Sequence, residues 1–355
     1  MSTPARRAPT VTLSWRSVPA LAAALALGLG ALAAFRFLIR PLALLTIAIT
    51  IGEALIPLVE RLARRVPRAL AIGIVFFGVF LAAGLLGWIV VPRLVAQGQA
   101  FAERVPELVA RARAWLERLP WFSGDQLAQY LGPRLAQAGG LLVSLPLQLF
   151  SLAADVLVVV FLAIYWVAGV PALRRFVYSL FPLEHRIGAA QVFGDMARAM
   201  GGYVRGAAIN AVIMGALAWL GLSLIGVDYA IVLGVLTMLG EPIPFLGPLL
   251  AAIPVVLIAL LQSPAKALLA LGLYVILQNV EGHLLTPNIM RRETEVPQTL
   301  VIFALLAGGA VGGLLGVLVA LPLAGAVRVF LLRVIAPAIR RRVGAPPPDG
   351  VTPAT

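Results

Sequence analysis

The chain has 355 residues, of which 61% are hydrophobic and only 12% are charged, and its mean hydropathy is +1.00. A soluble domain usually carries about twice that charged fraction, so the composition excludes an ordinary soluble protein and predicts a polytopic membrane protein. The formal net charge of +13 does not indicate a nucleic-acid partner, because the arginines cluster between apolar stretches, as in cytoplasmic loops.

The first apolar stretches predict membrane-spanning helices. Residues 18–35 and 41–59 are expected to form a helical pair with a tight link at Arg36–Arg40. The basic residues 60–68 are then cytoplasmic, and residues 69–91 cross outward.

The next fifty residues change character. Apolar residues recur at helical spacing with glutamate and arginine between them, which predicts an amphipathic extracytoplasmic helical segment over 92–138. We interpret this segment as a cap packed on the membrane domain or on a neighbouring subunit, and membrane-surface binding is the alternative.

The second half alternates full spans with interrupted ones. Residues 141–170 return inward, the arginine-bearing 171–205 is expected to form short amphipathic helices in the cytoplasm, and 206–226 crosses outward. The basic residues 291–296 require helix 265–286 to run inward. Segment 229–261 therefore starts and ends outside, which favours a re-entrant hairpin with "GEPIPFLGP" as its tip over a kinked full span.

The same reasoning applies to residues 297–327, whose middle reads "AGGAVGGLLG". Each arm is about 13 residues, too short to span alone. Two hairpins entering from opposite sides form an inverted-repeat-like pattern, in which broken helices meet near the midplane and build a transport site.

The predicted fold is therefore all-α, with about five to six full transmembrane helices plus two re-entrant helical hairpins in the C-terminal half. The expected regions are a cytoplasmic N-terminal tail (1–17), N-terminal transmembrane helices (18–91), the extracytoplasmic segment (92–138), a transmembrane helix with a cytoplasmic amphipathic segment (139–205), a transport core (206–335) and a cytoplasmic C-terminal tail (336–355).

Polar residues inside helix 265–286 are candidates for the site. Gln278 and Glu281 share one face, and Asn279 lies on the adjacent face with His283. Because ionisable groups inside a membrane helix are costly and usually face the protein interior or a cavity, these residues are expected to bind a solute or carry protons. The alternative is that they hydrogen-bond the unwound backbone of the hairpin tips.

Carboxylates elsewhere raise the same question. Glu241 at the first tip is a candidate proton-coupling acid, although it could instead cap the second arm or lie exposed in a vestibule. Asp155 is a second candidate, with a distant arginine as its partner, whereas Glu53 is interpreted as reaching the membrane interface.

The remaining candidates lie at the two tips. In the first, Pro242, Pro244 and Gly247 interrupt the helix beside Glu241. In the second, the glycines either pack helices closely or leave backbone amides free for an anion; these are Gly308, Gly309, Gly312 and Gly313.

Four motifs in order resemble the AI-2E family of bacterial transporters. They are the stretch from "YVRGAAINAVIMG" to "AIVLGVL", then "IPFLGPLLAAIPVVLIAL", "QNVEGHLLTPNIM" and "LLAGGAVGGLLGVLVALPLAGAVRV". The resemblance is strongest over 203–330 and weaker, through hydropathy layout, over 18–202. The family includes autoinducer-2 exporters, PerM-type permeases and some sodium/proton antiporters.

The resemblance implies a bacterial inner-membrane protein with both termini cytoplasmic, a homo-oligomeric assembly and transport without ATP hydrolysis. It places residues 244–248 and 278–287 at characteristic family positions. This chain departs at Gly240-Glu241, where an apolar or amide residue is more usual, and the extra acid favours a cationic or proton-coupled substrate over direct transfer of autoinducer specificity.

The leading hypothesis is a secondary transporter or exporter of a small polar solute such as the quorum-sensing signal autoinducer-2. The first alternative is a sodium (cation)/proton antiporter using Asp155, Glu241 and Glu281. The second is a non-transporting membrane scaffold.

An enzyme is not expected. Cysteine is absent, HExxH and GxSxG motifs are missing, and the single lysine, Lys266, leaves no GxxxxGK[ST] nucleotide-binding loop. No catalytic residue, metal ligand or cofactor is expected, and the expected partners are a small polar solute or cation, the lipid bilayer and other copies of the chain, but no nucleic acid.

Overall fold

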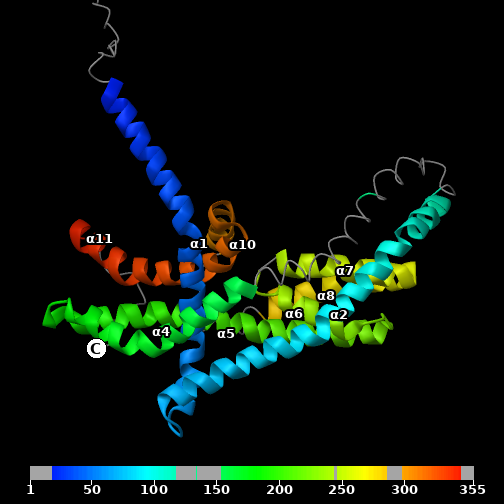
Figure 1. Cartoon of the computed structure of the whole chain (residues 1–355), viewed down its shortest axis with the longest axis horizontal. Helices are drawn as coiled ribbons and strands as arrows, with labels where there is room; N and C mark the ends of the chain where they lie inside the picture. The colour runs from blue at the N-terminus through cyan, green and yellow to red at the C-terminus, as the bar shows by residue number, and fades with distance from the viewer. Residues whose placement is uncertain (1–17, 117–132, 134–152, 244–245, 286–297, 345–355) are drawn as a thin grey trace, which may run out of the picture.

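The computed structural model describes residues 18–116, 133, 153–243, 246–285 and 298–344, and within these ranges the chain is helical with no strand (Figure 1). The elements are α1 (Val18–Leu62), α2 (Arg68–Leu116), α4 (Ala153–Ser179), η1 (Leu183–His185), α5 (Arg186–Ile225), α6 (Ala230–Gly240), α7 (Leu246–Gln262), α8 (Pro264–Val280), η2 (Glu281–Leu285), α10 (Gln298–Phe330), η3 (Leu331–Ile335) and α11 (Ala336–Val343).

Within the described ranges, six helices are long and apolar enough to cross a membrane. The prediction of a polytopic all-α membrane protein is therefore confirmed. The candidates, selected by length and composition, are Phe37–Leu62, Arg68–Arg93, Ala154–Ser179, Leu183–Ile225, Pro264–Leu285 and Thr299–Val343, of which the last contains a sharp turn at Gly313.

The predicted helical pair at the N-terminus is wrong, because α1 continues without a turn through Arg36–Arg40. Arginine, leucine and phenylalanine in that stretch do not break a helix, and Pro41 is accommodated inside it. Similarly, α2 continues from the predicted span into the amphipathic segment as far as Leu116. Beyond Leu116 that segment and residues 141–152 of the next predicted helix lie outside the described residues, except for residue 133.

Helices α1, α2 and α4 share one apolar core. It contains Leu44, Ile56 and Val59 from α1, and it is completed by residues of α2 and α4, among them Val75, Phe76, Val159, Ala163 and Val167. Residues 171–205 were expected to form short amphipathic helices separate from a span over 206–226. Instead α5 is one 40-residue helix, and a Cβ on its Gly201 would lie 2.6 Å from the backbone of Glu53 in α1. The glycine therefore permits close helix packing rather than ending the helix.

Helices α6, α7 and α8 form an antiparallel meander that packs against α5 (Figure 1). At the open end of the α6–α7 hairpin, the amide of Asp228 donates to Gln262 Oε1 at 3.3 Å. At its closed end, a Cβ on Gly247 would lie 1.8 Å from the carbonyl oxygen of Gly240. Residues seven apart in a continuous helix are separated by about 10 Å, so the chain folds back here rather than kinking.

Helix α10 is also two arms. Gly313 has φ 56° and ψ −138°, which only glycine adopts readily, and a Cβ on Gly316 would lie 1.9 Å from the Gly308 carbonyl oxygen. Each arm is about 15–17 residues, or roughly 22–26 Å, shorter than the ~30 Å hydrocarbon core. Both predicted hairpins therefore exist as hairpins, and their entry into the membrane stays a prediction.

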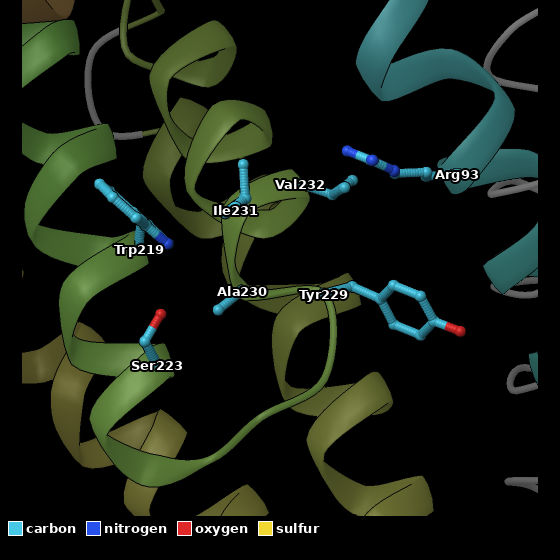
Figure 2. Close-up of a pocket in the computed structure, with 7 residues that line it drawn as sticks. All are labelled: Arg93, Trp219, Ser223, Tyr229, Ala230, Ile231 and Val232. Atoms are coloured by element: carbon cyan, nitrogen blue, oxygen red, sulfur yellow. The ribbon is translucent and has the colours of Figure 1, made fainter.

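Helix α2 also reaches the meander. Val90 of α2 packs with Val232 of α6, next to a cavity whose lining residues are shown in Figure 2. This contact places the part of α2 around Val90 against the start of α6.

Candidate functional site

Three helices bring polar side chains to one point. The amide nitrogen Nδ2 of Asn210, in α5, donates to Glu241 Oε2 at 3.0 Å and to Glu281 Oε1 at 3.1 Å. Glu241 follows the last residue of α6, and Glu281 follows the last residue of α8. One amide group therefore joins two carboxyl groups that lie 40 positions apart in the sequence.

Glycine lets α5 and α6 approach closely enough for this contact. A Cβ on Gly215 would lie 2.9 Å from the carbonyl oxygen of Gly234, and a Cβ on Gly234 would lie 2.7 Å from that of Gly215. Because the helices are antiparallel and joined by a short turn, Asn210 before Gly215 faces Glu241 after Gly234. Gly215 and Gly234 thus position the Glu241 carboxyl group beside Asn210, although neither glycine belongs to the site.

Glu281 stands where the helix geometry changes. The chain leaves α8 and enters a single π-helical turn, η2, at this residue. Such turns are frequent at functional sites because they widen the helix and redirect a side chain. Gln278, one turn earlier, donates its Nε2 to Glu281 Oε2 at 3.2 Å.

A second polar contact ties the two helices of the site together. The hydroxyl groups of Thr237 in α6 and Tyr274 in α8 are hydrogen-bonded to each other, and both residues are buried. Thr237 lies one helical turn before Glu241, and Tyr274 lies two turns before Glu281. This contact fixes the spacing between the helices that carry Glu241 and Glu281.

Two buried acceptor oxygens of the site lack a hydrogen-bond partner among the described residues. Only 5% of Glu241 and 8% of Asn210 is exposed, and neither Glu241 Oε1 nor Asn210 Oδ1 has a hydrogen-bond partner among the described residues. The two carboxyl groups are close enough to interact electrostatically. Buried oxygens without a donor, beside a second carboxyl group, are suited to hold a proton, a monovalent cation or the hydroxyl groups of a polar solute.

Among the described residues, no group of three or more histidine, aspartate and glutamate side chains is arranged to hold a metal ion. The site's ligands would be two carboxyl groups and amide oxygens. Such a set suits hard cations or hydroxyl donors rather than transition metals.

The structure thus brings together Glu241, Gln278 and Glu281 from the predicted set. Asn279 does not join them, because its side chain donates to the Val275 carbonyl oxygen of its own helix at 2.8 Å. Pro242 is exposed beside Glu241, and Pro244 lies outside the described residues. Gly247 serves the hairpin contact with Gly240.

The glycine tip of α10 lies elsewhere. Helix α10 packs mainly on α5 and α1, and Leu315, two residues after Gly313, packs against the α1–α2–α4 core. Gly308, Gly309, Gly312 and Gly313 are therefore not beside Glu241, and the expected meeting of the two tips is not observed. An apolar residue at the turn makes burial in that core more favourable than exposure in a polar site.

Asp155 is also elsewhere, and it is neutralised. Both of its carboxylate oxygens accept from Arg40 Nη2 at 2.9 Å. The distant arginine partner that the sequence suggested is thus present on α1.

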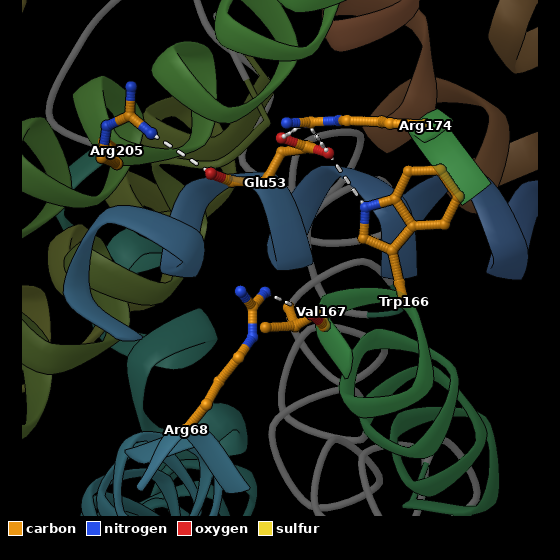
Figure 3. Close-up of polar contacts among 6 residues, drawn as sticks. All are labelled: Glu53, Arg68, Trp166, Val167, Arg174 and Arg205. Carbon is orange, nitrogen blue, oxygen red and sulfur yellow. Dashed lines mark hydrogen bonds and ion pairs between the residues drawn. The ribbon is translucent and has the colours of Figure 1, made fainter. Parts of the chain in front are cut away.

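Glu53 was interpreted as reaching the membrane interface, but its carboxylate is buried and paired inside the protein. Only 7% of it is exposed, Arg174 Nη2 pairs with its carboxylate at 2.9 Å, and Trp166 Nε1 donates to Oε1 at 3.0 Å (Figure 3). Figure 3 also shows Arg205 reaching the Glu53 carbonyl and Arg68 reaching that of Val167. These contacts join α1, α2, α4 and α5.

Sequence reasoning missed Asn210, Thr237 and Tyr274. An asparagine in the middle of the apolar stretch 206–226 is itself a signal, because a buried amide needs partners. The identity of those partners required the tertiary contact.

Six potential spans among the described residues, with a polar site between helices, make this a polytopic all-α membrane protein. The family model described as AI-2E family transporter matches residues 21–336. The chain belongs to the AI-2E transporter family.

The relatives agree with this assignment. The chain is 30% identical to YueF of Bacillus subtilis (strain 168) over 44% of the chain and 42% of that protein. It is 28% identical to MT0215 of Mycobacterium tuberculosis (strain CDC 1551 / Oshkosh) over 88% and 87%, respectively. It is 27% identical to the AI-2 transport protein TqsA of Escherichia coli (strain K12) over 80% and 83%. The match thus spans less than half the length of YueF but most of MT0215 and TqsA.

Proposed function

We propose that this protein is a secondary transporter that moves a small polar solute through the site formed by Asn210, Glu241, Gln278 and Glu281. The observation that carries the proposal is the single amide of Asn210 bonded to two carboxyl groups, one of them buried with an unpartnered oxygen. The predicted location is the bacterial inner membrane, with both termini cytoplasmic.

The distribution of donors and acceptors supports a polar substrate. Carboxyl groups only accept hydrogen bonds when ionised, and the amides of Asn210 and Gln278 are already engaged as donors. A solute rich in hydroxyl groups would satisfy the spare oxygens. The name of TqsA supports autoinducer-2, a polyhydroxylated molecule, as the first solute to test, with export as the expected direction.

Cation/proton antiport is the second candidate, and the same spare oxygens favour it. Glu241 is buried beside the half-buried Glu281, and no printed ion pair joins either carboxyl group to an arginine or lysine of the described residues, so ionising both would carry a desolvation and repulsion penalty unless a proton or a cation neutralises one of them. Binding a proton and a cation alternately at one site is the requirement for exchange. Asp155 does not share this property, because Arg40 already neutralises it.

The transport proposal also predicts that no nucleotide energises the cycle, since the chain has one lysine and no phosphate-binding loop. A homo-oligomeric scaffold without flux is the remaining alternative. It would leave the carboxyl pair without a role.

The experiment is solute flux in proteoliposomes with an imposed pH gradient, for the wild type, Glu241→Gln and the control Glu184→Gln. Autoinducer-2, a few organic anions and sodium are the substrates offered. Glu184 is 79% exposed on η1, so its substitution removes a carboxyl group without touching the site.

We expect gradient-driven flux that falls about tenfold or more in Glu241→Gln and is unchanged in Glu184→Gln. Sodium-dependent proton movement lost in Glu241→Gln would select antiport over solute export. Absence of flux for every substrate with folded protein would favour the scaffold.

A further inference from the structure

A second site lies at the opposite end of α6 from Glu241. It is an open cavity of about 420 Å³ between α2, α5 and the start of α6. Helix α6 has 11 residues, so the cavity is roughly 15 Å from the carboxyl pair. The lining residues are Arg93, Trp219, Ser223, Tyr229, Ala230, Ile231 and Val232 (Figure 2).

Four of the lining side chains carry hydrogen-bond donors: the guanidinium of Arg93, the indole of Trp219 and the hydroxyls of Ser223 and Tyr229. The described part of the chain supplies no hydrogen bond or ion pair to these groups. Figure 2 shows Arg93 on α2 facing the start of α6, with Trp219 and Ser223 on the α5 side. Side chains that carry donors, from α2, from α5 and from the turn before α6, therefore line one cavity.

The placement of these groups is built into the fold. Val90, one turn before Arg93, is almost fully buried against Val232, which holds the arginine over the first turn of α6. Tyr229 has φ 63°, the left-handed region that a residue other than glycine enters at a cost. That conformation turns the chain sharply between α5 and α6 and leaves the Tyr229 side chain at the cavity edge.

The charged side chain that lines the cavity is positive. No carboxyl group lines it, and Arg93 supplies the positive charge. Asp228 is adjacent to Tyr229 in sequence but is exposed and outside the lining. Arginine with hydroxyl and indole donors is the combination that recognises phosphate oxygens, because its planar guanidinium can donate two parallel hydrogen bonds.

We propose that this cavity binds the phosphate group of an anionic ligand, with Arg93 as the charged contact and Ser223, Tyr229 and Trp219 as further donors. The apolar floor of Ala230, Ile231 and Val232 accommodates the carbon chain next to that phosphate. A lipid headgroup and a free phosphate compound share this chemistry.

Two measurements distinguish the sources. In the first, inorganic phosphate is titrated onto the delipidated protein in detergent and the thermal unfolding midpoint is recorded. In the second, protein is released from nanodiscs of phosphatidylglycerol or phosphatidylcholine, and native mass spectrometry counts the retained lipids.

The variants are Arg93→Gln, Ser223→Ala and the control Arg175→Gln. Arg175 is exposed on α4, away from the cavity, so its loss removes the same charge from a different surface. We expect Arg93→Gln to weaken phosphate or phosphatidylglycerol binding about tenfold, because it removes a charge-assisted contact. Ser223→Ala is expected to weaken it about threefold as a neutral hydrogen bond, and it carries the test if Arg93→Gln does not fold.

Saturable binding of phosphate alone would identify a free anion, and selective retention of phosphatidylglycerol would identify a lipid headgroup. Either result, with the dependence on Arg93 or Ser223, supports the proposal. Failure of both probes to bind, or binding by both cavity variants equal to that of Arg175→Gln, overturns it. The transport assay does not enter this test, so the two proposals fail independently.

Discussion

Carboxyl groups inside the helix bundle have different partners in the two halves of this molecule. On the α1–α4 side, Glu53 is paired with Arg174, and Asp155 with Arg40. On the α5–α8 side, the hydrogen bonds to Glu241 and Glu281 among the described residues come from the neutral amides of Asn210 and Gln278.

A paired carboxylate joins helices and has little left to offer a ligand. Amide donors bring no positive charge to a carboxyl group, and at Glu241 they leave one oxygen, Oε1, without a hydrogen-bond partner among the described residues. The comparison therefore separates acids that stabilise the fold from acids suited to bind and release something, which burial alone does not do.

The two hairpins repeat this contrast. Both close through direct glycine-to-glycine backbone contact, Gly240 with Gly247 and Gly308 with Gly316. The first delivers Glu241 to α5 and α8, whereas the second delivers Leu315 to the apolar core of α1, α2 and α4. The same kind of glycine contact therefore closes one hairpin at a polar site and the other at an apolar core.

The largest effect on stability is expected at the glycine-to-glycine backbone contact that closes both hairpins. Gly316→Ala should lower the free energy of unfolding by about 3 kcal/mol or more, because the new Cβ overlaps a backbone carbonyl that cannot move independently. Gly312→Ala is the control, since nothing lies within 4 Å of its Cβ position. It should stay within about 1 kcal/mol of the wild type, where alanine is the better helix former. Denaturant unfolding in mixed micelles measures both. Equal stability of the two variants would mean that the hairpin is not closed at this glycine.

The next effect tests the paired side. Arg174→Gln should cost about 2 kcal/mol, less than the ~3–5 kcal/mol of a fully buried pair because Arg174 is itself partly exposed. The neighbouring Arg175→Gln should change stability by no more than about 0.5 kcal/mol. The same unfolding assay reports both variants. A loss of the same size at Arg175 would show that charge alone, and not the Glu53 contact, matters.

The unpaired side is tested by removing its amide. Asn210→Ala should lower flux in proteoliposomes about tenfold, equivalent to ~1.4 kcal/mol, since both carboxyl groups lose the donor that positions them. Asn279→Ala is the matched control, because that amide donates to the Val275 carbonyl oxygen of its own helix. Flux that falls equally in both variants would contradict the assignment of the site to Asn210.

The smallest effect is expected at Asp155. Asp155→Asn should cost about 0.5 kcal/mol of stability, because Arg40 is largely exposed and such pairs contribute little. Flux and its dependence on the pH gradient should be unchanged, since Asp155 is already neutralised. A lost pH dependence in this variant would move the coupling site to the α1–α4 side.

Much of the architecture followed from the sequence. Apolar length predicted the membrane helices, and prolines and glycines near Glu241 and Gly313 predicted both hairpins. Helix ends were predicted less well. Arg36–Arg40 and the stretch near residue 205 were expected to interrupt helices that the structure continues, because long-range packing, as of Gly201 on Glu53, decides whether a helix goes on.

The candidate site was also predicted only in part from the sequence. That Glu241, Gln278 and Glu281 need polar surroundings could be predicted from each residue's own position, because an ionisable group in an apolar helix must be compensated locally. That Asn210 compensates two of them, that Asp155 and Glu53 have arginine partners, and that the glycine tip lies against a different core depended on contacts between distant segments. Helical periodicity and hydropathy are local properties, so they can be recognised in the sequence itself. Which side chains pair depends on which helices come into contact, and the tertiary packing at the glycines decides that.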